Sequence, residues 1–223
     1  MNDLHPNCAE RTQFMPDARP KVDASAHLLD LSGVEGPLVW ADVFGRDGPV
    51  EVEVGSGKGL FLQNAATLRP GHGFVGVELS KKYAVKAAER AAKRGLANVK
   101  VWPGDAKLFL ARFAPDASLH AVHVYFPDPW WKARHKKRRV FGEPLVADVE
   151  RALVPGGELH VATDVEEYFG VMSSLVATRP RFEPIAPLEL GTPESELDYL
   201  TNFERKYRIE GRPIFRASYR LSR

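Results

Sequence analysis

Carboxylates stand at or just after the ends of four short apolar runs in the first two thirds of the sequence. They belong to Glu53, Glu78, Asp105 and Asp128. If these runs are parallel strands, their carboxyl ends meet along one edge of a sheet, where α/β proteins bind ligands. Because such strands are usually apolar on both faces, acids at their ends indicate a function. We expect a ligand with amino, hydroxyl or cationic groups, since ionised carboxylates accept hydrogen bonds and attract cations.

A glycine-rich turn follows the first carboxylate, in Glu53-Val54-Gly55-Ser56-Gly57-Lys58-Gly59. A dinucleotide fingerprint requires glycine at position 60, where Leu60 stands. A phosphate-binding P-loop requires Ser or Thr after the Gly-Lys pair, where Gly59 stands. What remains, an acid two positions before G-x-G-x-G, is similar to the first motif of class I methyltransferases. Their donor, S-adenosylmethionine, has no phosphate and carries a sulfonium and an ammonium.

The acids fit that donor in order along the chain. Glu53 is expected near its cationic end. Glu78, about 20 residues after the glycine turn, is placed to accept both ribose hydroxyls, and Asp105 to accept the adenine amino group. The predicted cofactor-binding residues are Glu53, Gly55, Gly57, Glu78, Asp105 and Asp128. The alternative for Glu53 is an ion-paired strand residue, and its neighbour Glu51 has no role in this interpretation.

Asp128 lies between two prolines, in Phe126-Pro127-Asp128-Pro129-Trp130. Prolines restrict the backbone on both sides, so we expect the carboxylate to project rigidly into the crevice, with a turn or cap as the alternative. Directly after it, a basic run without acids holds Lys132, Arg134, Lys136, Lys137, Arg138 and Arg139. The rest of the chain is mildly acidic, with 25 basic against 29 acidic residues. This concentration of charge indicates a docking site for a polyanion.

The elements that must position these residues follow an alternation of strand and helix patterns, which is typical of a mainly parallel sheet with helices on both faces. We predict one Rossmann-like α/β domain over residues 21–223, after a flexible tail at 1–20. The seven predicted strands span residues 50–54, 74–79, 99–102, 119–126, 157–163, 181–185 and 214–220. The clearest helix spans 81–94, with Ser80 as its N-cap. Its predicted inward stripe is Tyr83, Ala84, Ala87, Ala88 and Ala91.

Composition argues against several other classes of protein. No apolar run is long enough for a membrane span, and no secretory signal pattern opens the chain, so we expect a cytoplasmic protein. The single cysteine, Cys8, cannot form an internal disulfide. The seven histidines lack ligand spacing, and His120 and His123 are expected on opposite faces of a strand, so no metal site is predicted. Oligomeric state is left open.

The segment around Asp128 closely resembles the signature of the tRNA (guanine-N7)-methyltransferase family, a Phe-Pro-Asp-Pro-Trp segment followed by Lys132 and the run 134–139. Trp131 stands where proline is common. The resemblance continues through Ala162-Thr163-Asp164 and Thr201-Asn202-Phe203-Glu204, with Asn202 where lysine is common. It covers roughly residues 50–220.

The resemblance implies methyl transfer from S-adenosylmethionine to N7 of guanine at position 46, in the variable loop of tRNA. It gives Asp128 the catalytic role and the basic run the RNA contacts. It also implies substrate contacts for Lys132, Asp164, Thr201, Asn202, Phe203 and Glu204. The alternatives are an exocyclic-amine nucleic-acid methyltransferase and a non-catalytic RNA-binding module.

Overall fold

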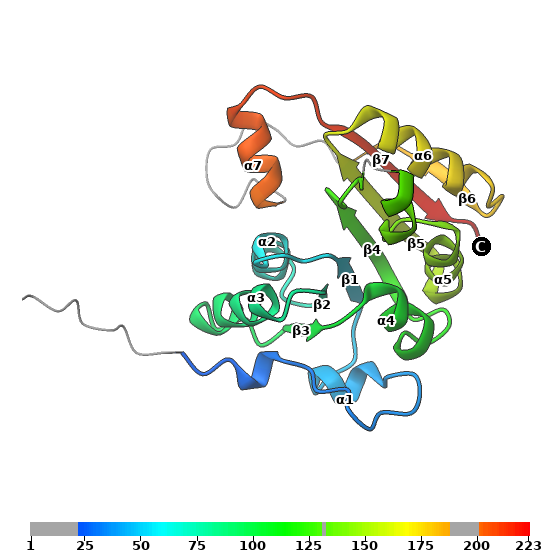
Figure 1. Cartoon of the computed structure of the whole chain (residues 1–223). Helices are drawn as coiled ribbons and strands as arrows, with labels where there is room; N and C mark the ends of the chain where they lie inside the picture. Colours follow the sequence, from blue (N-terminus) through cyan, green and yellow to red (C-terminus); the bar gives the residue numbers. More distant parts are fainter. Residues whose placement is uncertain (1–21, 131–132, 188–200) are drawn as a thin grey trace, which may run out of the picture.

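A seven-stranded sheet forms the centre of the molecule (Figure 1). The computed structural model describes residues 22–130, 133–187 and 201–223, so the expected tail at 1–20 lies outside it. The strands are β1 (Val50–Val54), β2 (Gly73–Glu78), β3 (Val99–Pro103), β4 (Leu119–Tyr125), β5 (Leu153–Thr163), β6 (Phe182–Ile185) and β7 (Phe215–Leu221). Their order is β3-β2-β1-β4-β5-β7-β6, and β7 runs in the opposite direction to the other six of these strands.

This order places the predicted carboxylates at a topological switch point. The chain proceeds from β1 to β2 and β3 on one side, and then returns to β4 on the other. The carboxyl ends of β1 and β4 therefore border a crevice of the kind in which open α/β sheets bind ligands. The predicted α/β class and the seven predicted strands are confirmed. β5 begins earlier than expected because a register shift lets Leu153 pair with Leu119.

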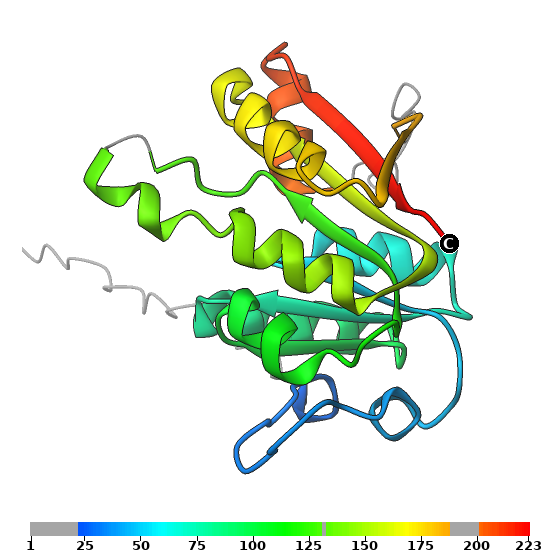
Figure 2. The same cartoon turned by 90° about the vertical axis from the view of Figure 1, so that its right-hand side faces the viewer.

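Helices cover both faces of the sheet. They are α1 (Trp40–Phe44), α2 (Leu60–Leu68), α3 (Lys81–Lys93), α4 (Ala106–Phe113), α5 (Glu143–Ala152), α6 (Glu166–Ala177) and α7 (Asn202–Ile209), with 3-10 turns η1 (Ser25–His27) and η2 (Ala133–Arg138). Helices α2 and α3 pack on one face. Helices α4, α5 and α6 form the layer on the other face, which Figure 2 shows in front of the strands.

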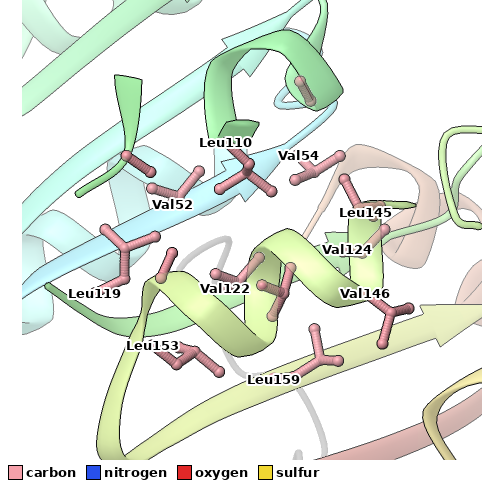
Figure 3. Close-up of a cluster of buried hydrophobic side chains, with 14 of the residues drawn as sticks. Val52, Val54, Leu110, Leu119, Val122, Val124, Leu145, Val146, Leu153 and Leu159 are labelled. Carbon is pink, nitrogen blue, oxygen red and sulfur yellow. The ribbon is translucent and has the colours of Figure 1, made fainter. Parts of the chain in front are cut away.

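Strand alternation decides which side chains of β1 face which layer. Val52 and Val54 pack with Val122, Val124 and side chains of α4 and α5 in the core shown in Figure 3. Glu51 and Glu53 consequently point to the opposite face, beneath α2. Both glutamates are buried. Residues in the described segments form no helix that is long and apolar enough to cross a membrane.

Helix α3 matches its prediction at the alanines but not at the first turn. Ala84, Ala87, Ala88 and Ala91 are buried against the sheet. The prediction that Tyr83 faces inward with the alanines is wrong. The residue is 42% exposed, because the first turn of α3 faces the mouth of a cavity. Ser80 occupies the N-cap position, but its side chain makes no capping bond.

Candidate active site

Three glycines with left-handed backbone shape the turn after β1. Gly55, Gly57 and Gly59 have φ of +78°, +53° and +73°. The Gly57 N–H donates to Oε2 of Glu78 at 2.8 Å, which ties the turn to the end of β2. A Cβ on Gly55 or Gly57 would enter open space, whereas one on Gly59 would lie 2.8 Å from Cβ of Ala87. The first two glycines thus leave room for a ligand, and the third lets α2 and α3 pack closely.

Gly59→Ala is expected to destabilise the fold by roughly 2–4 kcal/mol, because it combines backbone strain with overpacking against α3. Gly57→Ala is the matched control: it has similar strain but no clash, so its loss should be about 1–2 kcal/mol. Urea unfolding followed by circular dichroism measures both. Equal losses would show that the contact with Ala87 is unimportant.

Two adjoining cavities open at this edge of the sheet. The larger, of about 500 Å³, is lined by Glu78, Asp105, Asp128 and Asp164 among others. The smaller, of about 270 Å³, contains Glu53. The cavities share five lining residues, which are Gly55, Gly57, Tyr83, Tyr125 and Phe203. The structure therefore brings the acids from four strand ends to one connected site, with Glu53 in a side chamber.

Glu53 is a buried carboxylate with an unsatisfied oxygen. The residue is 3% exposed, and its Oε2 has no hydrogen-bond partner among the described residues. Burial raises its pKa well above the ordinary value, and the nearby charge of Glu78 adds to the effect. A buried polar atom without a partner is costly, so the site is suited to a ligand that brings a cation or a donor. The ion-paired alternative for Glu53 is wrong, because no described residue forms an ion pair with it.

Glu78 and Asp105 each accept hydrogen bonds from backbone N–H groups. Besides Gly57, Glu78 accepts from the Ser80 N–H at 2.8 Å. Asp105 caps α4 by accepting from the Lys107 N–H at 2.8 Å. These bonds fix the carboxylates at the cavity wall, and each ionised carboxylate has further lone pairs for a ligand.

Asp128 lies in a strained loop at the same cavity. Phe126 and Trp130, on either side of it, have φ of +51° and +42°. Bulky residues rarely adopt this conformation, and such strain is concentrated at functional sites. Oδ1 of the exposed Asp128 accepts a hydrogen bond from the Trp130 N–H at 3.1 Å. Asp128 therefore closes a turn, as one of the two sequence interpretations expected. The loop holds this carboxylate at the cavity as well as closing a turn.

The basic run divides into anchoring and exposed residues. Arg139 donates to the Pro129 carbonyl at 2.7 Å and covers the Tyr168 ring, so it secures the Asp128 loop. Arg138 lines the larger cavity, and its guanidinium lies 5.1 Å from the centroid of the Trp130 ring. This placement favours a structural role for Arg139 over the RNA contact that the sequence suggested.

The other predicted basic contacts are only partly visible. Arg134 is exposed and contacts His135. Lys132 lies outside the described residues, and so do the side chains of Lys136 and Lys137. Their roles stay predictions.

The residues assigned to the substrate by resemblance do not all reach the site. Asp164 lines the larger cavity and pairs with Arg212. Thr201 lines the smaller cavity and caps α7, while Asn202 and Phe203 also line it. Glu204 is fully buried and forms ion pairs with Arg208 and Arg216 at 2.9 and 2.8 Å. Its carboxylate therefore helps to hold α7 against β7, which argues against contact with the substrate.

Glu51, which had no role in the sequence interpretation, organises a buried polar cluster beneath the site. Its carboxylate accepts from Arg69, from Nδ1 of His72 at 2.7 Å and from Nε2 of His123 at 2.7 Å. Burial raises its pKa, but the bond to His123 and the charges of His123 and Arg69 outweigh this and lower it to about 2. His123 also bonds the hydroxyl of Tyr125 at 3.0 Å. The cluster thus supports Tyr125, whose side chain lines both cavities. No local sequence signal indicated this cluster.

Glu51→Gln should remove a pH-dependent part of the stability. Because the folded pKa of about 2 lies below the ordinary value of 4.5, this contribution is present above pH 4.5 and is lost as the pH falls toward 2. The shift corresponds to about 3 kcal/mol. Urea unfolding at pH 7 and pH 3 measures the difference between wild type and variant, which should shrink at pH 3. A difference that does not change with pH would contradict the ionised cluster.

The sheet order and the acidic, glycine-lined edge define a class I methyltransferase fold. Solved structures agree: a 16S rRNA methyltransferase, KamB, has a TM-score of 0.59 at 17% identity, covering 82% of this chain and 93% of its own. The aminoglycoside resistance methyltransferase NpmB1 has a TM-score of 0.57 at 18% identity, covering 82% of this chain and 91% of its own.

Among the described residues no group of His, Cys, Asp or Glu could hold a metal ion.

Sequence comparison identifies the family. The family model described as "Putative methyltransferase" matches residues 47–217. The tRNA (guanine-N(7)-)-methyltransferase of Rhodopirellula baltica is 43% identical, over 90% of this chain and 76% of its own length. The enzyme of the same name from Geobacillus kaustophilus is 35% identical, over 80% and 82%. The chain belongs to the tRNA (guanine-N7)-methyltransferase family.

Proposed function

We propose that this protein transfers the methyl group of S-adenosylmethionine to N7 of a guanine in tRNA, at position 46 of the variable loop. Relatives that match most of the chain are named as tRNA (guanine-N(7)-)-methyltransferases, which supports the reaction and the methylated atom. A tRNA substrate agrees with the expected cytoplasmic location. The observation that carries the proposal is the single connected site formed by Glu53, Glu78, Asp105 and Asp128.

The residues of the site fit S-adenosylmethionine. Oε2 of Glu53 lacks a partner and suits a cationic group, and Gly55 and Gly57 leave space where side chains would protrude. Glu78 and Asp105 offer acceptors for hydroxyl and amino groups. The cofactor supplies an electrophilic methyl group on a sulfonium. Glu53, Gly55, Gly57, Glu78 and Asp105 would hold the cofactor.

Guanine N7 makes modest chemical demands on the protein. It has an in-plane lone pair and loses no proton on methylation, so a strong general base is unnecessary. Orientation of the two reactants can supply about 7–11 kcal/mol in well-aligned systems. We assign Asp128 to this task, since its carboxylate can accept hydrogen bonds from the donor groups of guanine, and its anchored loop fixes where it points. Asp164 would contact the same base.

The exposed basic residues after Asp128 are assigned to the RNA backbone. Arg134 and Arg138 are exposed, and Lys132, Lys136 and Lys137 lie in the same segment. A flexible tRNA loop can present a splayed base to the cavity, which a regular duplex cannot do without distortion. Phe203, Phe126 and Tyr207 form an aromatic group near the opening, with ring centroids 5.4 to 6.2 Å apart, and offer surfaces on which a base can stack.

Radiolabelled methyl transfer to unmodified tRNA transcripts, followed by nucleoside analysis, tests the proposal. We expect labelled 7-methylguanosine, and loss of the label when position 46 is not guanine. Labelled N2-methylguanosine or N6-methyladenosine would point instead to the exocyclic-amine alternative. Tight tRNA binding without any binding of S-adenosylmethionine would indicate a non-catalytic RNA-binding module.

A further inference from the structure

A groove over α2 and α3 gathers basic side chains beside the active site. It has a volume of about 460 Å³, and its lining includes Lys58, Lys86, Arg90, Lys93 and Arg94. Lys58 comes from the glycine turn, and the others come from α3 and its C-cap. The two helices lie side by side (Figure 1). The α3 cations recur at helical spacing and share one face, so elements distant in sequence combine into one surface.

Four of the basic side chains in this groove are exposed and form no ion pair with a described residue. Lys58, Lys86, Lys93 and Arg94 are exposed. Within the described segments, none of these four forms an ion pair, whereas Arg151, Arg179 and Arg220 on other surfaces pair with acids. Glu89 is the acid among the lining residues. The Lys58 ammonium lies 5.5 Å from the centroid of the Tyr83 ring, a contact that leaves its positive charge available.

The groove adjoins the active site at Lys58. Lys58 lines both the groove and the cavity that contains Glu53. A chain of phosphates lying along α3 would therefore lead to the opening where a base has to enter. Helical spacing alone is more typical of a solvated face. The convergence of the α3 cations with Lys58, which also lines the cavity of Glu53, favours a binding surface.

We propose that this groove binds the phosphate backbone of the tRNA substrate, as a second contact surface distinct from the basic run after Asp128. The proposal rests on the proposed function for its ligand. Together the two surfaces would hold the RNA on both sides of the opening, so that a base between them is presented to the cavity. Phosphate contacts of this kind position a nucleic acid without reading its sequence.

The test compares two double variants that lose the same charge. Lys86→Gln with Lys93→Gln removes two groove cations. Arg181→Gln with Arg223→Gln removes two exposed cations near β6 and β7, at the opposite side of the sheet. Binding of an unmodified tRNA transcript is measured by filter binding over a range of salt, with S-adenosylmethionine affinity and thermal unfolding as controls for folding.

The groove variant should bind the transcript about tenfold more weakly at low salt, and its log-log salt slope should be shallower by roughly 1.4 to 1.8. Its cofactor affinity and unfolding temperature should match those of the control variant. If both variants bind tRNA alike, with the same slope, the groove proposal is overturned, while methylation by the wild type would still support the proposed function. If the wild type binds tRNA through the groove but forms no 7-methylguanosine, only the proposed function fails.

Discussion

Asp128→Ala is expected to lower kcat for tRNA methylation by about 100-fold or more, while tRNA affinity changes less than about threefold. The reason is that the carboxylate orients the base next to the methyl donor, whereas affinity comes mainly from phosphate contacts. Single-turnover methyl transfer and filter binding on the same preparation separate the two quantities.

The control for Asp128 is Asp128→Asn, which keeps the size of the side chain and an oxygen that can accept from the Trp130 N–H. If Asp128 only closes the turn, the asparagine variant should be almost fully active. If its charge and both its oxygens orient guanine, this variant should also be slow, with the loop intact by thermal unfolding. Parallel losses of rate and affinity in the alanine variant would refute the positioning role.

Glu53→Gln should stabilise the protein without cofactor at neutral pH and weaken S-adenosylmethionine binding by roughly 10- to 100-fold. In the folded protein the pKa of Glu53 is raised, so its contribution to stability is present below the ordinary pKa and is lost as the pH rises through the folded value. Glutamine keeps the shape of the side chain and removes the free-energy cost of burying an ionisable carboxyl group. Weaker binding follows because the amide cannot offset the positive charge of the ligand.

Cofactor binding to the wild type should also release a proton at pH values where Glu53 of the free protein is protonated, because a cation beside Glu53 favours the ionised carboxylate. Calorimetry in buffers of different ionisation enthalpy measures this release, and affinity should rise with pH toward the pKa of the free protein. The glutamine variant should show neither effect. Unchanged affinity in this variant, with no gain in stability, would remove Glu53 from the cofactor site.

The parts of the site that sequence predicted are those with local signals. The glycine turn is recognisable from sequence because G-x-G-x-G after an apolar run fits few other structures. Strand periodicity places Glu78, Asp105 and Asp128 at the carboxyl ends of their strands. The structure adds that Glu53 lies in a side chamber of the cavity, which depends on how α2 and α7 pack over it.

What sequence could not predict depends on contacts between distant segments. The cluster around Glu51 joins residues from β1, the end of α2 and β4, and His123 is 72 positions away. Glu204 falls within a motif that resembles the family signature, but only the packing of α7 on β7 shows that it points inward to Arg216. Tyr83 fits the apolar stripe of α3. Its exposure becomes clear only from the structure, in which the first turn of α3 lies at the mouth of a cavity.

The proposed reaction requires N7 of guanine as the atom that is methylated. A tRNA carrying 7-deazaguanine at position 46 has a C–H in place of the lone pair, while its Watson–Crick edge and backbone are unchanged. Methyl transfer to this tRNA should fall to background, with binding equal to that of the normal transcript. Continued methylation of the substituted base would contradict the account, because the methyl group would then be going to a different atom.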